Sequence, residues 1–183
     1  MEPGEQTIHQ YLVRRSKEGD RQAQSELYRL FVNAMYNISR RMMGDDEEAK
    51  DVLQDVFIEA FSKLHTLERE VTFPAWLKRI VVNKSINALR KKKDLTTGLE
   101  EDIEFPETEE ILDKDIIRYR ADRIMRAADK ISKGCKTVFN LYLFDGYDHK
   151  EIGQILSITE SASKAQYSKA KSKIRKILEA NAI

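Results

Sequence analysis

Cysteine, proline and glycine are all scarce in this chain of 183 residues, which has one cysteine, three prolines and seven glycines. A single cysteine, Cys135, cannot form an intramolecular disulfide and is typical of a reducing cytoplasm. Few glycines and prolines favour long helices over a turn-rich β fold. The sequence therefore predicts an all-α protein.

Membrane-spanning and secretory patterns are missing as well. No apolar run approaches the roughly 18 residues that a helix needs to cross a bilayer. The first ten residues, MEPGEQTIHQ, are too polar and acidic for a secretory signal. We expect a cytoplasmic protein that does not insert directly into a membrane.

Patterns typical of catalysis, cofactor binding and metal binding are also missing. The three histidines, at positions 9, 65 and 149, have no cysteine or second histidine at ligand spacing. The sequence contains no glycine-rich phosphate loop and no G-x-S-x-G motif. We expect no catalytic residue, no metal site and no cofactor, and hence a protein that is not an enzyme.

Charge is abundant and is sorted into blocks. Charged residues make up 34% of the chain, yet the formal net charge is only +1. Residues 78–93 carry seven basic residues and residues 161–178 carry six, and neither stretch has an acid. Residues 94–115 carry ten acids against Lys114 alone. Such segregation indicates partners of opposite charge.

Apolar periodicity predicts four helices before the acidic block. Asp20 is a candidate N-cap, Gly44 a candidate terminator, and Pro74 suits a helix start because its missing N–H is harmless there. The four helices are expected over residues 5–18, about 21–43, about 45–64 and about 75–92, with a loop, HTLEREVTFP, before the last.

The acidic block is interpreted as a linker, residues 94–116, because it contains Pro106 and lacks a sustained helical period. The fold is therefore expected to consist of two small all-α domains, residues 1–93 and 117–183, joined by this linker. In the second domain a helix over residues 117–131 is expected to be broken from the next one at Gly134.

The end of the chain is predicted to be a helix-turn-helix. DGYDHKEIGQIL holds a turn at Gly146 and a capping box of Asp148 with Glu151. The three residues SIT then form a tight turn before a last helix that runs to about Ala180. Two helices joined by so short a turn are typical of the helix-turn-helix motif.

The last helix has an inner and an outer face on a wheel of 100° per residue. The inner face, which should pack on the preceding helices, holds Ser163, Tyr167, Ala170 and Ile174. Small and basic side chains on the outer face can approach base edges and phosphates. The alternative is a solvated lysine face. The candidate DNA contacts here are Lys164, Ala165, Ser168, Lys169 and Lys173.

The fourth helix carries a polar stripe that runs from Trp76 to Arg90. Asparagines offer a donor and an acceptor, and two of them four residues apart suit contact with unpaired bases. Plain exposed surface is the alternative for the asparagines, and a core position is favoured for Trp76. The candidate DNA contacts are Arg79, Asn83, Lys84, Asn87 and Arg90.

The third helix presents the opposite charge. Its outer face is predicted to expose Asp51, Gln54, Asp55 and Glu59. Most acidic faces are ordinary solvated surface, but this one is unsuited to DNA and suits a basic protein partner.

Three stretches resemble segments of bacterial RNA polymerase sigma factors. The polymerase-binding segment is matched by DDEEAKDVLQDVFIEAFSKL and the promoter-melting helix by FPAWLKRIVVNKSINALRKKK. The C-terminal helix-turn-helix is matched by SKGCKTVFNLYLFDGYDHKEIGQILSITESASKAQYSKAKSKI. The two-domain layout is similar to that of the extracytoplasmic-function (ECF) group of the sigma-70 family.

The resemblance implies a sigma factor that directs promoter recognition, melting and transcription initiation. The acidic face of the third helix would meet the clamp helices of the largest polymerase subunit. Asn83 and Asn87 would engage the melted minus-ten element, with a flipped base held by residues 67–73. The minus-35 contacts are matched by Lys164, Ala165, Ser168 and Lys169.

The implied partners are core RNA polymerase and promoter DNA, and the resemblance allows an anti-sigma factor. The promoter sequence does not follow, because Gln166 replaces a common arginine and Ser161-Ala162-Ser163 replaces a common Gly-Thr-Val. Ser132-Lys133 also replaces a common Leu-Pro pair. The alternative is a polymerase-independent helix-turn-helix DNA-binding regulator.

Overall fold

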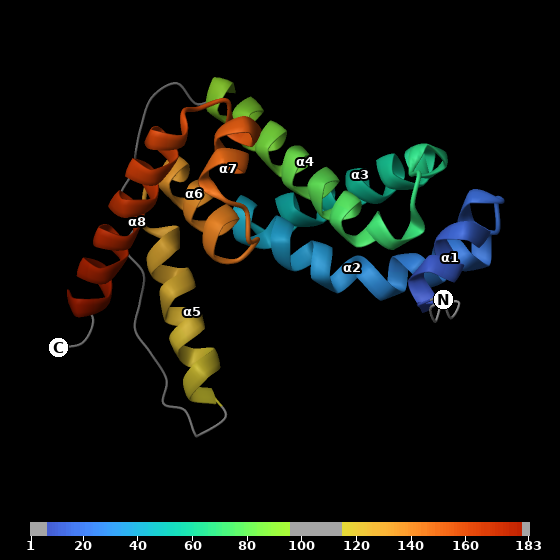
Figure 1. Ribbon diagram of the computed structural model, residues 1–183. Coiled ribbons are helices and arrows are strands. Elements are labelled where there is room, and N and C mark those ends of the chain that lie inside the picture. The colour runs from blue at the N-terminus through green and yellow to red at the C-terminus, as the bar shows by residue number, and fades with distance from the viewer. Residues whose placement is uncertain (1–6, 96–114, 181–183) are drawn as a thin grey trace, which may run out of the picture. The chain divides into compact units, whose positions relative to one another are not determined.

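The computed structural model describes the backbone of residues 7–95 and 115–180 and the side chains of residues 7–92 and 121–180. Regular structure in these ranges is helical throughout, which confirms the all-α class (Figure 1). The chain divides into two compact units, Met1–Leu95 and Thr96–Ile183. Most of the predicted linker, residues 96–114, lies outside the described residues, as do residues 5 and 6 of the first predicted helix.

Over its described residues, 7–95, the first unit holds four α-helices and two short 3₁₀ turns. Asp20 caps α2 by accepting hydrogen bonds from the N–H groups of Gln22 and Ala23, and Gly44 ends that helix with a φ of 81°. Both predictions at these ends are confirmed. The elements are α1 (Ile8–Lys17), α2 (Arg21–Met43), α3 (Asp46–Lys63), η1 (Leu64–Thr66), η2 (Glu70–Thr72) and α4 (Phe73–Leu95).

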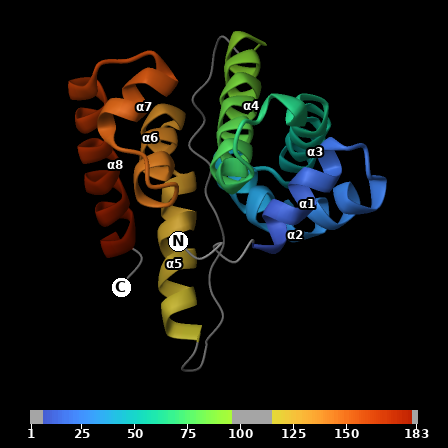
Figure 2. The same cartoon turned by 45° about the vertical axis from the view of Figure 1, so that its right-hand side comes forward.

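The core of this unit lies where α2, α3 and α4 pack on one another, with α1 against α2 (Figures 1 and 2). The apolar face of α3 is buried along Val52, Val56 and Ala60. On α4, Leu77, Val81 and Val82 are almost fully buried. Because each helix buries one face only, the opposite faces of α3 and α4 stay exposed.

The second unit holds α5 (Asp115–Asp129), α6 (Lys133–Leu143), α7 (His149–Leu156) and α8 (Glu160–Ala180). In both views α6 and α7 lie beside α8, and α5 also contacts α8 (Figures 1 and 2). Its core includes Val138, Leu141, Ile152 and Ala170, each with essentially no exposed surface.

The predicted break at Gly134 is wrong, because that residue lies in the first turn of α6. The break falls at residues 130–132, where Ser132 has extended backbone angles and its carbonyl accepts a bond from the N–H of Lys136, 2.9 Å away. Gly134 instead faces the side chain of Gln166 on α8. Glycine is tolerated in a first turn, so composition alone misplaced this boundary.

Candidate protein and nucleic-acid interfaces

The outer face of α3 is formed by local capping and by the burial of the opposite face. Asp45 accepts a hydrogen bond from the N–H of Glu48 at 2.9 Å, and Asp46, Glu47 and Glu48 occupy the first turn, where the helix dipole favours acids. Asp51, Gln54 and Asp55 are exposed as predicted. Ile58, one turn further along, is 62% exposed, so an apolar side chain continues this acidic face.

Glu59, the fourth residue predicted on that face, lies differently. Its carboxylate is 2.6 Å from the Lys63 ammonium and 2.9 Å from the Lys84 ammonium. Hydrogen bonds from these two lysines lower the pKa of Glu59 below its usual value. The Glu59 carboxylate therefore ties α3 to α4, and is not a free acid of the outer face.

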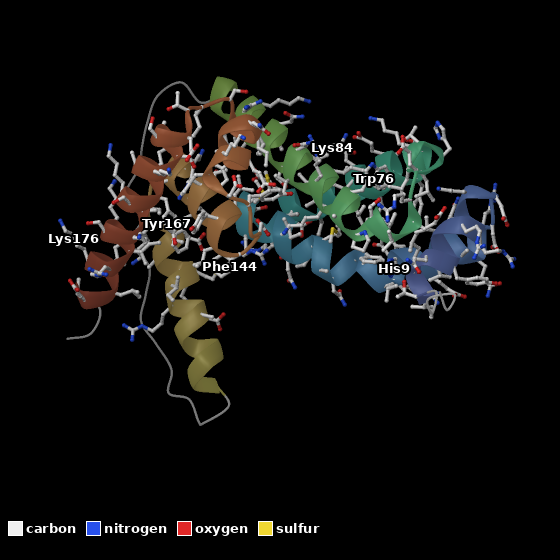
Figure 3. All side chains as sticks on the ribbon, in the orientation of Figure 1. His9, Trp76, Lys84, Phe144, Tyr167 and Lys176 are labelled. Atoms are coloured by element: carbon white, nitrogen blue, oxygen red, sulfur yellow. The ribbon has the colours of Figure 1, made fainter. Side chains whose placement is uncertain are left out.

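The polar stripe of α4 is exposed along its length, as predicted, at Arg79, Asn83, Asn87 and Arg90. Trp76 at its start is half-buried, and its ring lies 5.9 Å from that of Phe73 (Figure 3). The tryptophan therefore packs partly in the core and keeps one part accessible beside the stripe.

Lys84 lies beside the stripe, at the contact between α3 and α4 (Figure 3). Its hydrogen bond to Glu59 raises the pKa of Lys84 above its usual value. A second pair, between Lys92 and Glu48 at 2.6 Å, joins the end of α4 to the start of α3. These ion pairs join the acidic helix to the basic one, and Lys84 belongs to both candidate interfaces.

The turn between α7 and α8 is closed by backbone bonds. The Gly153 carbonyl accepts from the N–H of Ile158 at 3.0 Å, and Ser157 takes a left-handed conformation with a φ of 58°. The Thr159 hydroxyl accepts from the N–H of Ala162 at 3.1 Å and caps α8. A Cβ on Gly153 would lie only 2.8 Å from the Ile158 carbonyl oxygen. Glycine at this position therefore permits the turn.

Gly153 was missed by sequence reasoning. The available signal was a glycine inside a helical pattern just before a tight turn, which commonly marks close packing.

The two faces of α8 follow the predicted wheel. Ser163, Ala170 and Ile174 are buried, and the Tyr167 ring stacks on Phe139 at 6.0 Å. The Ser163 hydroxyl lies 2.9 Å from Nδ1 of His149, a bond between α8 and α7 that the sequence did not predict. The outer face exposes Lys164, Ala165, Ser168, Lys169 and Lys173.

Two of the lysines on α8 have partners that were missed. Lys164 forms an ion pair with Glu160 at 2.6 Å, which the spacing of four residues could have revealed. The Lys171 ammonium lies over the Tyr167 ring at 4.8 Å from its centre. Lys176, further along, points away from the domain core (Figure 3).

Within the described ranges, no group of three or more His, Cys, Asp or Glu side chains could hold a metal ion. None of the described helices is both long and apolar enough to span a bilayer.

Two family models match the chain, one over the α3 and α4 faces and the other over the α8 face. Sigma-70 region 2 matches residues 27–94, which hold most of α2, all of α3 and nearly all of α4. Sigma-70 region 4 matches residues 121–174, which hold α6, α7 and most of α8. Together they cover about two thirds of the chain. The chain belongs to the sigma-70 family.

Relatives place this sigma factor in the ECF group. It is 25% identical to the ECF RNA polymerase sigma factor SigW of Bacillus subtilis over 91% of this chain and 94% of that protein. It is 24% identical to the ECF RNA polymerase sigma factor SigM of Mycobacterium tuberculosis over 87% of this chain and 79% of that protein.

Solved structures share the fold. CnrH, solved with the cytosolic domain of CnrY, superposes with a TM-score of 0.57 at 22% identity, over 94% of this sigma factor and 97% of that chain. RpoE of Bartonella quintana, solved with the anti-sigma factor NepR, gives a TM-score of 0.57 at 19% identity, over 85% and 96%.

Proposed function

We propose that this ECF sigma factor binds core RNA polymerase and directs promoter recognition, melting and transcription initiation. The observation that carries the proposal is the sorting of charge over three helix faces, acidic on α3 and basic on α4 and α8, in a chain of this family. The protein acts in the cytoplasm and is not itself an enzyme, because RNA synthesis remains the reaction of the polymerase.

The acidic face of α3 is the proposed polymerase-binding surface. Asp51, Gln54 and Asp55 are exposed and suit a basic partner. Glu59 lies at the end of this surface, where it also holds Lys84 beside the DNA-binding stripe. We therefore assign polymerase contacts to Asp51, Gln54 and Asp55. Glu59 was predicted to share this role, but its carboxylate pairs with Lys63 and Lys84.

The stripe of α4 is the proposed surface for the melted minus-ten element. Amide side chains bind the edges of unpaired bases, whereas arginines and lysines bind phosphates. This supports roles for Arg79, Asn83, Lys84, Asn87 and Arg90. The preceding segment, residues 67–73, is proposed to hold a flipped base.

The outer face of α8 is the proposed minus-35 surface. A helix-turn-helix places its second helix in the major groove, where small residues allow a close approach. The exposed Ala165 and Ser168 meet that need, and basic residues flank them. The proposed contacts are Lys164, Ala165, Ser168, Lys169 and Lys173.

The domain division proposed is residues 1–93 and 117–183, with residues 94–116 as the tether. Of these residues, 94–95 belong to α4 and 115–116 to α5. The other 19 span at most about 65 Å, and the two domains supply the remaining reach to promoter elements roughly 70 Å apart, two turns of DNA. An anti-sigma factor is a further proposed partner, supported by the NepR complex of the similar RpoE fold.

The test is transcription in vitro from a genomic library, with core polymerase alone and with the added protein. The proposal requires promoter-specific RNA chains only when the protein is present. The rival, a polymerase-independent regulator, is favoured instead if the protein alone binds specific DNA at nanomolar concentration and does not co-elute with core polymerase.

Removing both asparagines of the α4 stripe separates melting from binding. We expect Asn83→Ala with Asn87→Ala to leave closed-complex binding nearly intact and to reduce opening roughly tenfold or more, since loss of a base contact costs about 1–3 kcal/mol. Permanganate footprinting of the bubble measures opening. The matched control is Asn33→Ala with Asn37→Ala, an exposed pair with the same spacing on α2. Undiminished opening in the α4 variant contradicts these roles.

Two lysines of α8 should differ in kind. Lys169→Ala is expected to weaken minus-35 binding by about 1–3 kcal/mol and to relax the base preference there, as for a lysine that contacts a base edge. Lys173→Ala should weaken binding about equally on all sequences, as for a phosphate contact. The slope of the logarithm of the binding constant against the logarithm of salt concentration should become shallower by about one. Titrations of the holoenzyme on promoter variants at several salt concentrations distinguish the two. Equal behaviour of both variants contradicts the base contact of Lys169.

A further inference from the structure

The segment between α3 and α4 has little regular structure of its own. Two backbone hydrogen bonds each close one 3₁₀ turn in this segment. The N–H of Leu67 donates to the Leu64 carbonyl at 3.1 Å, and the N–H of Thr72 donates to the Arg69 carbonyl at 3.0 Å. Leu67 is buried, while Glu68, Arg69 and Val71 are exposed. A segment bonded so locally needs contacts from elsewhere to keep one shape.

Lys17, the last residue of α1, supplies such a contact. Its ammonium donates to the Leu67 carbonyl oxygen at 2.5 Å and to the Glu70 carboxylate at 3.0 Å. These partners are 50 and 53 residues away along the chain. The Lys17 side chain is only 21% exposed, so the bonds are partly shielded from water. One charged group therefore ties both 3₁₀ turns to α1.

The surroundings favour a directional contact over general packing. α1 contacts both η1 and η2, and the bond from Lys17 is the main cause that holds the pKa of Glu70 below its usual value. Charge-assisted hydrogen bonds are short and directional, so they fix geometry more closely than apolar contacts do. Removing Lys17 frees a backbone oxygen and an acid in the same segment.

The tied segment leads directly into the stripe of α4. η2 ends at Thr72, α4 begins at Phe73, and the half-buried Trp76 follows within the first turn. A change in the path of residues 67–72 would therefore alter the exposed side chains that adjoin the stripe. A binding loop that is held in its bound shape loses less entropy when it binds.

We infer that Lys17 is a positioning residue, which sets the shape of residues 67–72 and thereby the preference for the unpaired base beside the α4 stripe. The inference rests on the proposed function and deepens it. It also makes α1 part of promoter recognition, although the region 2 match begins only at residue 27. Lys17 acts through the segment and need not touch DNA.

The experiment starts from a promoter recovered with the wild-type protein. Its minus-ten element is randomised, and transcripts made by the holoenzyme are counted for each template. For Lys17→Met we expect the preference at one position of the minus-ten element to fall about two- to tenfold, which corresponds to the cost of ordering a loop. Preferences at the other positions and co-elution with core polymerase should not change.

The matched control is Arg15→Met, because Arg15 also lies on α1 and pairs with Asp20 at 2.6 Å, away from the segment. It should keep the wild-type base preference. Lys17→Arg, which retains donors for both oxygens, should restore the preference. If Lys17→Met does not fold, Glu70→Ala removes the acceptor of one of the two bonds and should shift the same position.

The outcomes separate the two proposals. A wild-type protein that starts no RNA chain with core polymerase overturns the proposed function. An active wild type whose base profile is unchanged in Lys17→Met overturns the inference alone. A uniform loss of transcription in both Lys17→Met and Arg15→Met, with the profile unchanged, assigns Lys17 a structural role only and also overturns it.

Discussion

Asp55→Arg is expected to abolish co-elution of this sigma factor with core RNA polymerase. Asp55 is exposed in the middle of the acidic α3 face, one turn before the exposed Ile58. A charged group beside an apolar side chain loses its water when a partner covers both. Reversing the charge of Asp55 places an arginine against a basic partner, and the two positive charges repel. We expect binding to weaken by about 2–5 kcal/mol, at least roughly thirtyfold. Gel filtration and titration of labelled polymerase measure this loss.

The control for Asp55→Arg is Glu26→Arg, the same kind of charge reversal at an exposed position of α2. It should leave polymerase binding within about twofold of wild type, because isolated surface charges contribute little. Thermal unfolding of both variants should match that of the wild type. Retained binding of Asp55→Arg would remove the assignment of α3 as the polymerase surface.

Gly153→Ala is expected to disrupt the helix-turn-helix and with it minus-35 binding. The added Cβ would lie 2.8 Å from the Ile158 carbonyl oxygen, a backbone atom of the turn. Backbone cannot move aside as a side-chain end can, so the turn must open. We expect a loss of about 1–3 kcal/mol in stability of the second unit. Thermal unfolding of the full chain and promoter binding by the holoenzyme measure the effect.

A second glycine provides the control. A Cβ on Gly134 would meet only the end of the flexible Gln166 side chain, with its Oε1 atom at 3.4 Å. Alanine is also the better helix former, so Gly134→Ala should be neutral or stabilise by up to about 1 kcal/mol. Equal stability of the Gly153→Ala and Gly134→Ala variants would contradict the role given to the turn.

The helices and the charged faces could be predicted from the sequence because both depend on residues close together in the chain. Capping by Asp20, Asp45 and Thr159 involves side chains within three residues of their backbone partners. Helical periodicity likewise predicted that Ser163 and Ile174 lie on the buried face of α8, as they do. Gly134 is the exception, since glycine breaks some helices and begins others.

Contacts between distant segments could not be predicted in this way. The sequence does not distinguish the three acids of the α3 face, Asp51, Asp55 and Glu59. In the structure, Glu59 is the one of the three that forms an ion pair with Lys84. Lys17 is likewise one of several basic residues in α1, and only the packing of α1 selects it for Leu67 and Glu70. A helical wheel gives the direction of a side chain and not the element that it meets.

By itself, the sequence determined that this protein is all-α, where most of its helices begin and end, and which faces carry charge. Those properties follow from hydrogen bonds and periodicities that close within a few residues. Only the tertiary structure decided which charges pair across helices, why Gly153 must lack a side chain, and that Lys17 holds the segment before α4. These depend on distances between residues far apart in the chain, and packing alone sets those distances.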